Sequence, residues 1–128
     1  MKYVIDSYAW IEYFEGSYIG EEVKEIVENS ENEIITNILN VSELSNYFER
    51  KNLDFENSYK ILISISKIYK FETKFAKEAG TLCAKIRKKI PSFGLIDSFV
   101  LLTARTADAK ILTGDKHFKD FKEAILLK

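Results

Sequence analysis

Tyr3-Val4-Ile5-Asp6 is a short run of aromatic and β-branched residues that ends in a carboxylate. A run of this kind predicts a buried strand with the acidic side chain at its C-terminal end, and Ser7 is a suitable cap for a following helix. Residues 110–113 repeat the pattern, and Gly114-Asp115 follows them. We therefore expect two buried strands, each followed by a carboxylate.

Strand and helix patterns alternate through the rest of the chain. Apolar residues at spacings of three and four predict helices, and short β-branched runs predict strands. This alternation implies right-handed crossovers and helices on both faces of a sheet. We predict an α/β fold: a three-layer α/β/α sandwich whose central, mostly parallel sheet has four to five strands. The expected strands are 3–6, 33–36, 68–71, 110–113 and 123–127. Two helices are expected within 10–29, with a break near Gly16-Ser17, followed by one that is capped by Thr36 or Asn37 and runs through Phe48, and by one over 54–67. A further helix is capped by Thr73 and runs through Ile86, and the last covers 93–106 after a break at Pro91-Ser92.

The composition is that of a folded domain. The 128 residues are 46% hydrophobic and 30% charged, with one proline, so we predict a single domain over residues 1–128. The net charge of -1 argues against nucleic-acid binding through bulk positive charge, although a local basic patch can still serve. The single cysteine, Cys83, excludes an intramolecular disulfide. No apolar run suits a signal peptide or a membrane span, and we expect a cytoplasmic protein without a membrane partner.

Two acidic residues at strand ends can meet if their strands are neighbours. Ligands of open parallel sheets bind beyond the C-terminal ends of the strands, where Asp6 and Asp115 are expected. Taken singly, each is better explained as a turn or cap residue. Asp97 is more informative, because it shares a predicted helical face with Val100 and Leu101. A carboxylate on such a face must be protonated, paired with a base or bound to a metal.

Glu43 is the fourth acidic candidate. It lies at the edge of the apolar stripe of its predicted helix, where a solvated glutamate is the alternative. Four oxygen donors without a histidine or cysteine cluster describe a site for a hard cation such as Mg²⁺ or Mn²⁺. Without the cation the carboxylates would repel one another, so we expect added Mn²⁺ to raise the thermal stability of the protein.

Four segments in order resemble the motifs of the PIN-domain family, in particular the small VapC-like toxins of toxin–antitoxin pairs. The resemblance spans nearly the whole chain. It implies a PIN-like fold and a metal-dependent endoribonuclease, the toxin of a type II pair, that forms a homodimer and binds a cognate antitoxin. It also implies that Asp6, Glu43, Asp97 and Asp115 are catalytic and hold one or two Mg²⁺ or Mn²⁺ ions, with Ser7 and Thr113 as supporting hydroxyls. The matching segments are Val4-Ile5-Asp6-Ser7-Tyr8-Ala9-Trp10-Ile11-Glu12-Tyr13-Phe14, Asn40-Val41-Ser42-Glu43-Leu44, Ile96-Asp97-Ser98 and Leu112-Thr113-Gly114-Asp115-Lys116-His117-Phe118.

Two residues depart from the family pattern. Tyr8 stands where many relatives have a small residue, and Ser98 stands where alanine is common. Both can alter the shape of the pocket, and neither removes a carboxylate. The only histidine, His117, is expected at the surface after the fourth strand rather than in catalysis.

RNA needs basic side chains around an acidic pocket. Lys85, Arg87, Lys88 and Lys89 precede the Asp97 helix, and Lys116 and Lys119 flank Asp115, so these basic side chains are candidate phosphate contacts. Ordinary solvated charge explains them equally well. The aromatic residues Tyr8, Trp10, Tyr13 and Phe14 can stack on bases or meet a partner, but their spacing favours packing.

Two other functions remain open. A magnesium-dependent phosphatase or receiver domain would use Asp6 as its phosphorylated residue, but Tyr8 stands where the phosphatase pattern has a second aspartate. No glycine-rich phosphate loop is present either. A non-catalytic module that binds RNA or protein would keep the fold, and retention of all four acids argues against it.

Overall fold

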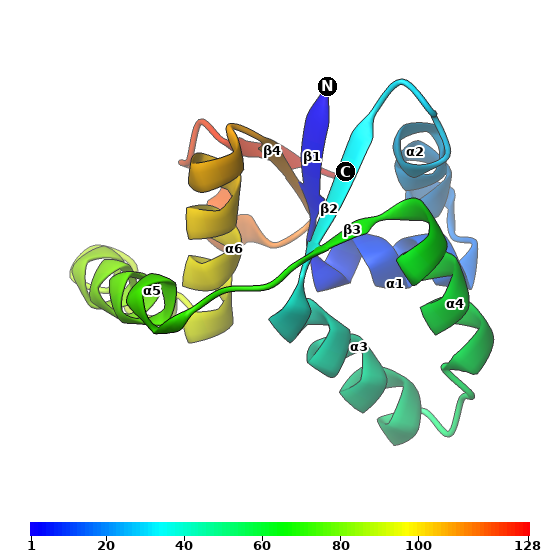
Figure 1. The fold of residues 1–128 in the computed structure, drawn as a ribbon, viewed down its shortest axis with the longest axis horizontal. Helices are drawn as coiled ribbons and strands as arrows, with labels where there is room; N and C mark the ends of the chain where they lie inside the picture. Colours follow the sequence, from blue (N-terminus) through cyan, green and yellow to red (C-terminus); the bar gives the residue numbers. More distant parts are fainter.

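Strands and helices alternate along the chain in the computed structural model, which describes residues 1–128 (Figure 1). The predicted α/β class is confirmed. None of the helices combines the length and the apolar character needed to cross a bilayer. The strands are β1 (Lys2–Ile5), β2 (Glu33–Asn37), β3 (Lys67–Tyr69), β4 (Lys110–Thr113) and β5 (Ala124–Leu126), the helices are α1 (Ser7–Glu15), α2 (Tyr18–Val27), α3 (Ile38–Arg50), α4 (Glu56–Ile65), α5 (Thr73–Ile86) and α6 (Leu95–Ala107), and a 3₁₀ turn, η1, covers Lys116–Phe118.

The sheet has five strands in the order β3-β2-β1-β4-β5, and every neighbouring pair is parallel. In the centre, Val4 of β1 pairs with Ile35 of β2 on one side and with Ile111 of β4 on the other. The order of strands therefore reverses at β1, since β2 and β3 lie to one side of it and β4 and β5 to the other. The C-terminal ends of β1 and β4 meet at this switch point, where ligands of such sheets bind.

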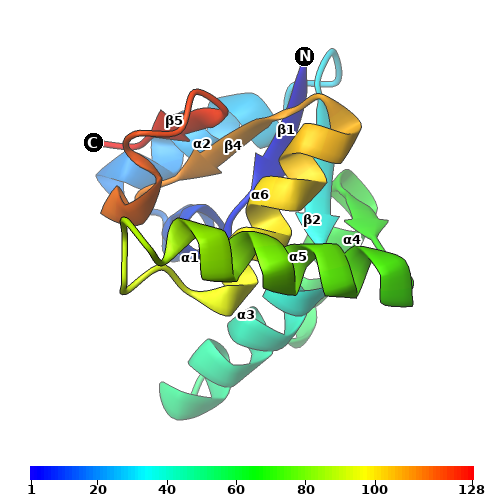
Figure 2. The ribbon, with the colours of Figure 1, turned by 90° about the vertical axis from the view of Figure 1, so that its left-hand side faces the viewer.

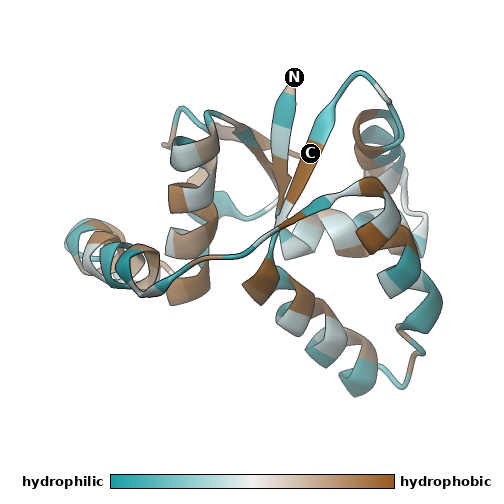
Figure 3. Ribbon diagram, in the orientation of Figure 1, coloured by the Kyte–Doolittle hydropathy of each residue, from teal (hydrophilic) through white to brown (hydrophobic).

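Alternate residues of the central strands supply two separate cores. Val4 and Ile111 belong to one buried cluster with Val100 and Leu101 of α6, whereas Ile5 and Leu112 belong to a second cluster with Trp10 of α1. This division follows from the period of two in a strand, which sends successive side chains to opposite faces. In Figure 3 apolar colouring marks parts of the central strands and of α6. Both faces of the central strands are thus buried.

The helices form the outer layers. One core is covered by α1, α2 and α4, and the other by α5 and α6, which face the viewer in front of the sheet in Figure 2. Helix α3 extends away from the C-terminal end of β2 (Figure 1). This is the predicted three-layer sandwich, with a fully parallel sheet. The break at Pro91-Ser92 is also present, since α5 ends at Ile86 and α6 begins at Leu95.

Several predicted boundaries and caps were wrong. The cap of α1 is Asp6 rather than Ser7: Oδ1 of Asp6 accepts a 2.9 Å hydrogen bond from the backbone N–H of Ser7, so the helix starts earlier than expected. Glu72 rather than Thr73 occupies the cap position of α5, and it makes no side-chain capping bond. Of the two alternatives for α3, Asn37 is the cap. Aspartate and serine are equally good caps, so the pattern alone does not choose between neighbours.

Candidate metal centre

The four predicted acidic side chains line one open pocket of about 570 Å³ at the switch point of the sheet. Asp6 follows β1, and Asp115 follows β4, two residues beyond its end. Glu43 comes from α3, and Asp97 from the first turn of α6. Ser7, Tyr8, Ile11, Gly114 and Lys116 complete the lining. Four distant segments therefore bring carboxyl groups to one place.

Asp6 is the most buried of these acids, with 5% of its surface exposed. Burial raises the pKa of Asp6 to about 7, a hydrogen bond from Thr113 opposes the rise, and the negative charges of Asp97 and Glu43 add to it. Desolvation and like charges both disfavour the ionised form. Ionisation of Asp6 is therefore unfavourable in the metal-free site, and a bound cation would favour it.

Thr113 links the two central strands through its hydroxyl group. Its Oγ1 donates a 2.7 Å hydrogen bond to Oδ2 of Asp6 and accepts a 3.0 Å bond from the backbone N–H of Asp115. One fully buried hydroxyl therefore orients Asp6 and fixes the turn that carries Asp115. This position agrees with the supporting role that the family resemblance implies for Thr113, and that role remains a prediction.

Glu43 is held by Ser7 and by a residue that sequence reasoning did not select, Asn40. Ser7 Oγ donates a 2.7 Å hydrogen bond to Oε1 of Glu43, and Asn40 Nδ2 donates to the same oxygen at 2.8 Å. Asn40 Nδ2 also lies 2.9 Å from Ser7 Oγ and 3.5 Å from Oδ1 of Asp6. The signal in the sequence was the spacing, because Asn40, Leu44 and Phe48 share a helical stripe that is buried in the structure. A buried amide on such a stripe needs polar partners.

Asp97 lies at the start of α6. Its Oδ2 accepts a 3.1 Å hydrogen bond from the backbone N–H of Gly94, so the side chain also caps the helix. Burial raises the pKa of Asp97 to about 6, although the Gly94 bond lowers it, and the charges of Asp115 and Glu43 raise it further. The predicted conflict between a carboxylate and an apolar helical face is therefore present and only partly relieved.

His117 lies beside the acids, which the expectation of an ordinary surface residue missed. The 3₁₀ turn places His117 next to Asp115, and the backbone N–H of His117 donates a 2.9 Å hydrogen bond to Oδ1 of Asp115. Its Nδ1 is 3.2 Å from Oδ1 of Asp115 and 4.0 Å from Oδ2 of Asp97. The 3.2 Å approach lacks the alignment of a hydrogen bond, and Nδ1 is closed off from solvent without a partner. Ligand atoms of Asp97, Asp115 and His117 all lie within 4.8 Å of one another.

The donor set fits a divalent cation. Lys116 is the only basic residue among four carboxylates in the lining, and the amide oxygen of Asn40 is buried nearby without a partner. Oxygen donors suit Mg²⁺ or Mn²⁺, and clustered carboxylates with raised pKa values are stabilised by such an ion. Asp6 and Glu43 line the pocket outside the tight group of Asp97, Asp115 and His117. The acids thus form two adjoining sets rather than one compact ring.

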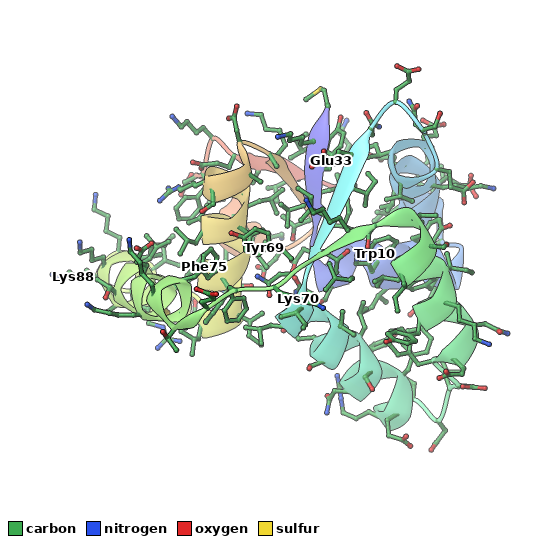
Figure 4. The ribbon with its side chains drawn as sticks, viewed as in Figure 1. Trp10, Glu33, Tyr69, Lys70, Phe75 and Lys88 are labelled. Atoms are coloured by element: carbon green, nitrogen blue, oxygen red, sulfur yellow. The ribbon has the colours of Figure 1, made fainter.

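The predicted basic residues are dispersed. Lys116 lines the pocket, but Nε of Arg87 donates a 2.7 Å bond to the carbonyl of Phe93 and so ties the turn after α5. Lys88 and Lys89 are exposed, and Lys88 points outward at the far end of α5 (Figure 4). A further basic surface lies between α5 and α6, in a shallow groove of about 360 Å³ that we call the α5–α6 groove. Its charged lining residues are Lys74, Lys77, Lys85, Arg105 and Glu78.

Three of the four aromatic residues of the first motif pack as predicted. The Trp10 ring is fully buried, stacks on Phe14 with centroids 5.5 Å apart and meets the edge of Tyr13. Figure 4 shows Trp10 next to the sheet. Tyr8 differs, because it is 39% exposed and forms a wall of the acidic pocket.

Comparisons with known proteins agree with this fold. A family model described as PIN domain matches residues 3–124. No curated protein sequence matches the chain significantly. Among solved structures, a toxin–antitoxin complex from Klebsiella pneumoniae is similar with a TM-score of 0.73 and 17% identity, over 95% of this chain and 94% of that one. VapBC2 from Rickettsia felis, bound to a promoter DNA fragment, has a TM-score of 0.72 and 20% identity, over 98% and 97%. VapC20 from Mycobacterium tuberculosis, a toxin that cleaves the sarcin–ricin loop, has a TM-score of 0.69 and 11% identity, over 98% and 89%.

Proposed function

Because this chain belongs to the PIN-domain family, we propose that it is an endoribonuclease that requires Mg²⁺ or Mn²⁺ and acts as the toxin of a type II toxin–antitoxin pair. One observation carries the proposal: carboxyl groups from four separate segments line one pocket at the switch point of the sheet. Without a cation, burial and mutual repulsion hold the pKa values of Asp6 and Asp97 far above those of free carboxyl groups. A structural role alone gives no reason to keep this arrangement.

Asp6, Glu43, Asp97 and Asp115 would hold the ion or ions. When bound, a divalent cation supplies polarisation of a phosphoryl oxygen and lowers the pKa of an attacking water. Hydrolysis adds that water across a P–O bond, so the chain needs no nucleophilic side chain of its own.

The hydroxyl and amide groups around the acids would serve as positioning groups. Thr113 orients Asp6, and Ser7 with Asn40 orients Glu43, through the hydrogen bonds given above. These bonds hold the carboxylates before any ion or substrate arrives. Such preorganisation lowers the cost of assembling the site during the reaction.

The RNA backbone would meet positive charge around and beyond the pocket. Lys116 is in the lining, and the α5–α6 groove adds three lysines against one glutamate, together with Arg105, which pairs with Glu123. Arg87, Lys88 and Lys89 remain candidates for the same role. A protein of net charge -1 needs such local clusters to offset its acidic site.

Cleavage of structured RNA tests the enzymatic part of the proposal. We expect the wild type to cut in Mg²⁺ or Mn²⁺ and to stop in EDTA, and we expect Asp6→Asn and Asp97→Asn to be at least about 100-fold slower. Asp54→Asn is the matched control, because Asp54 is exposed on the loop between α3 and α4 and asparagine can keep its bond to the Glu56 N–H. Equal cutting by all variants would indicate a contaminant. Binding of RNA without cleavage would instead favour a non-catalytic module.

The toxin assignment rests on the similarity to the solved toxin–antitoxin complexes. The proposed partners are an antitoxin, which would cover the acidic pocket, and a second copy of the chain. Exposed apolar side chains at the first turns of α3 and α6, Ile38 and Leu95, lie at the same edge of the sheet as the pocket and would suit such a cover.

Expression in a bacterial host tests the toxin role. Growth should stop with the wild type and continue with Asp6→Asn, and the RNA ends left after brief expression would identify the target. Normal growth with active wild-type enzyme would contradict the toxin role. A solution mass near twice 14.8 kDa would support the homodimer.

A further inference from the structure

We propose that His117 is a nitrogen ligand of the bound ion through Nδ1, and that Ser92 holds the imidazole in the tautomer that this requires. The inference rests on the proposed metal-dependent function and extends it to a residue outside the four acids. It makes the site one of mixed oxygen and nitrogen ligands.

The first observation is that Nδ1 of His117 lies close to two carboxylates and has no partner. Nδ1 is shielded from solvent and has no hydrogen-bond partner, although the ring as a whole is partly exposed. It lies 3.2 Å from Oδ1 of Asp115 and 4.0 Å from Oδ2 of Asp97. Ligand atoms about 2.1 Å from one ion in octahedral geometry lie about 3.0 Å apart when adjacent and about 4.2 Å apart when opposite. Both measured separations fall within this interval.

The second observation is the contact that the other ring nitrogen, Nε2, makes with Ser92. Nε2 of His117 is 2.9 Å from Oγ of Ser92, on the loop that leads into α6. A serine hydroxyl can accept a hydrogen bond from Nε2–H, which leaves the lone pair of a neutral imidazole on Nδ1. Metal-binding histidines commonly donate their second N–H in this way, and the donation fixes the ring orientation.

The ring is also held by packing. Its plane meets Phe93, a fully buried residue, in an edge contact with centroids 6.4 Å apart. The backbone of His117 is anchored to Asp115 by the bond that caps η1. Ser92, the Phe93 ring and the backbone bond to Asp115 thus hold the imidazole next to the two carboxylates before any ion binds. An ordinary surface histidine has no such constraints.

A nitrogen ligand changes the preference of the site. Imidazole binds first-row transition ions better than Mg²⁺, whereas carboxylates serve both. We therefore expect His117→Ala to weaken Mn²⁺ binding by about 10-fold or more and Mg²⁺ binding by less than about 3-fold. Ser92→Ala should weaken Mn²⁺ binding by a smaller factor, because the ligand stays and only its orientation is lost.

Pulsed electron paramagnetic resonance of bound Mn²⁺ is the direct test, since it detects coupling to a coordinated ¹⁴N nucleus. His117 is the only histidine of the chain, so in protein freed of any affinity tag an imidazole signal has one source. We expect the coupling in the wild type and in Asp54→Asn, and its loss in His117→Ala that still holds Mn²⁺. Melting curves of the variants establish that they are folded.

The alternatives give different results. If Mn²⁺ binds to the wild type without ¹⁴N coupling, the inference about His117 is wrong while the metal-dependent function stands. If Mn²⁺ does not bind at all, the proposed function itself fails and takes this inference with it. Coupling that persists in His117→Ala would also overturn the assignment.

Discussion

The hydroxyl of Thr113, at the end of β4, donates a 2.7 Å hydrogen bond to the carboxylate of Asp6, at the end of β1, across 107 residues of sequence. The contact exists because β1 and β4 are parallel neighbours whose C-terminal ends reach the same edge. It joins the two strand ends whose acidic residues the sequence first indicated. Both groups are buried, so their bond is made without competition from water.

Removal of this hydroxyl should weaken the fold and the site together. We expect Thr113→Val to lower the free energy of unfolding by about 1–3 kcal/mol, because Asp6 and the Asp115 N–H each lose a buried partner. Mn²⁺ affinity should also fall, since Asp6 is then free to turn. Urea denaturation and a Mn²⁺ titration measure the two effects. Thr81→Val, on the exposed side of α5, is the control and should change neither. If Thr113→Val kept the unfolding free energy and the Mn²⁺ affinity of the wild type, the bond would stabilise neither the fold nor the site.

The stability of the metal-free protein should depend on pH through Asp6 and Asp97. Burial raises their pKa values to about 7 and about 6, above the ordinary carboxyl value of 3.8 in the unfolded chain. Between about pH 4 and pH 7 the folded state therefore holds more protons than the unfolded state, and the contribution of these groups to stability falls as pH rises.

Asp6→Asn isolates this contribution, since asparagine does not ionise. In EDTA, we expect the stability of wild type relative to Asp6→Asn to be lower at pH 8 than at pH 5. Mn²⁺ should stabilise the wild type most at pH 8, where the acids are ionised and can bind it. Urea denaturation at the two pH values measures both effects. An equal difference between wild type and variant at pH 5 and pH 8 would contradict the prediction.

Tyr8 and Gly114 should behave as a coupled pair. A Cβ atom added at Gly114 would overlap the ring of Tyr8, so the glycine makes room for an aromatic residue where relatives often have a small one. We expect Gly114→Ala alone to cost about 1–3 kcal/mol through overpacking. The double variant with Tyr8→Ala should recover much of the lost stability, because the ring that overlaps the new Cβ is gone. Strict additivity of the two substitutions in a denaturation cycle would show that the residues do not interact.

The basic surfaces should govern RNA affinity. In an Asp6→Asn background, which prevents cleavage, we expect Lys74→Gln, Lys77→Gln and Lys85→Gln together to weaken RNA binding and to flatten its dependence on salt. Arg87, Lys88 and Lys89 form a second set to be changed in the same way. Lys24, Lys51 and Lys60, on α2, on the loop after α3 and on α4, provide a control of equal charge. If all three sets weaken binding equally, only net charge matters and neither surface is specific.

The fold could be predicted from sequence because its signals are local and repeated. Short β-branched runs between amphipathic helices indicate a parallel sheet, and the carboxylates that follow Ile5 and Thr113 indicate the functional edge. The boundaries were less certain, since the cap of α1 shifted from Ser7 to Asp6. That choice depends on which side chain the strand end directs at the helix, a tertiary property.

The four acids were accessible to sequence reasoning, but two of their neighbours, His117 and Asn40, were not selected. Asp97 could be selected because a charge on an apolar face needs an explanation. His117 could not, because a 3₁₀ turn reverses its direction and Ser92 approaches from a separate loop. Asn40 was visible as a polar residue in an apolar stripe. Its contact with Glu43 lies within α3, but its contact with Ser7 depends on how α3 packs against α1.

We propose that these distant carboxylates share a divalent ion. Crystals soaked in Mn²⁺ and measured near the manganese absorption edge test it most directly. We expect an anomalous peak in the pocket, about 2.0–2.4 Å from oxygens of at least two of Asp6, Glu43, Asp97 and Asp115. A pocket without such a peak at saturating Mn²⁺, or a peak only elsewhere on the molecule, would contradict it.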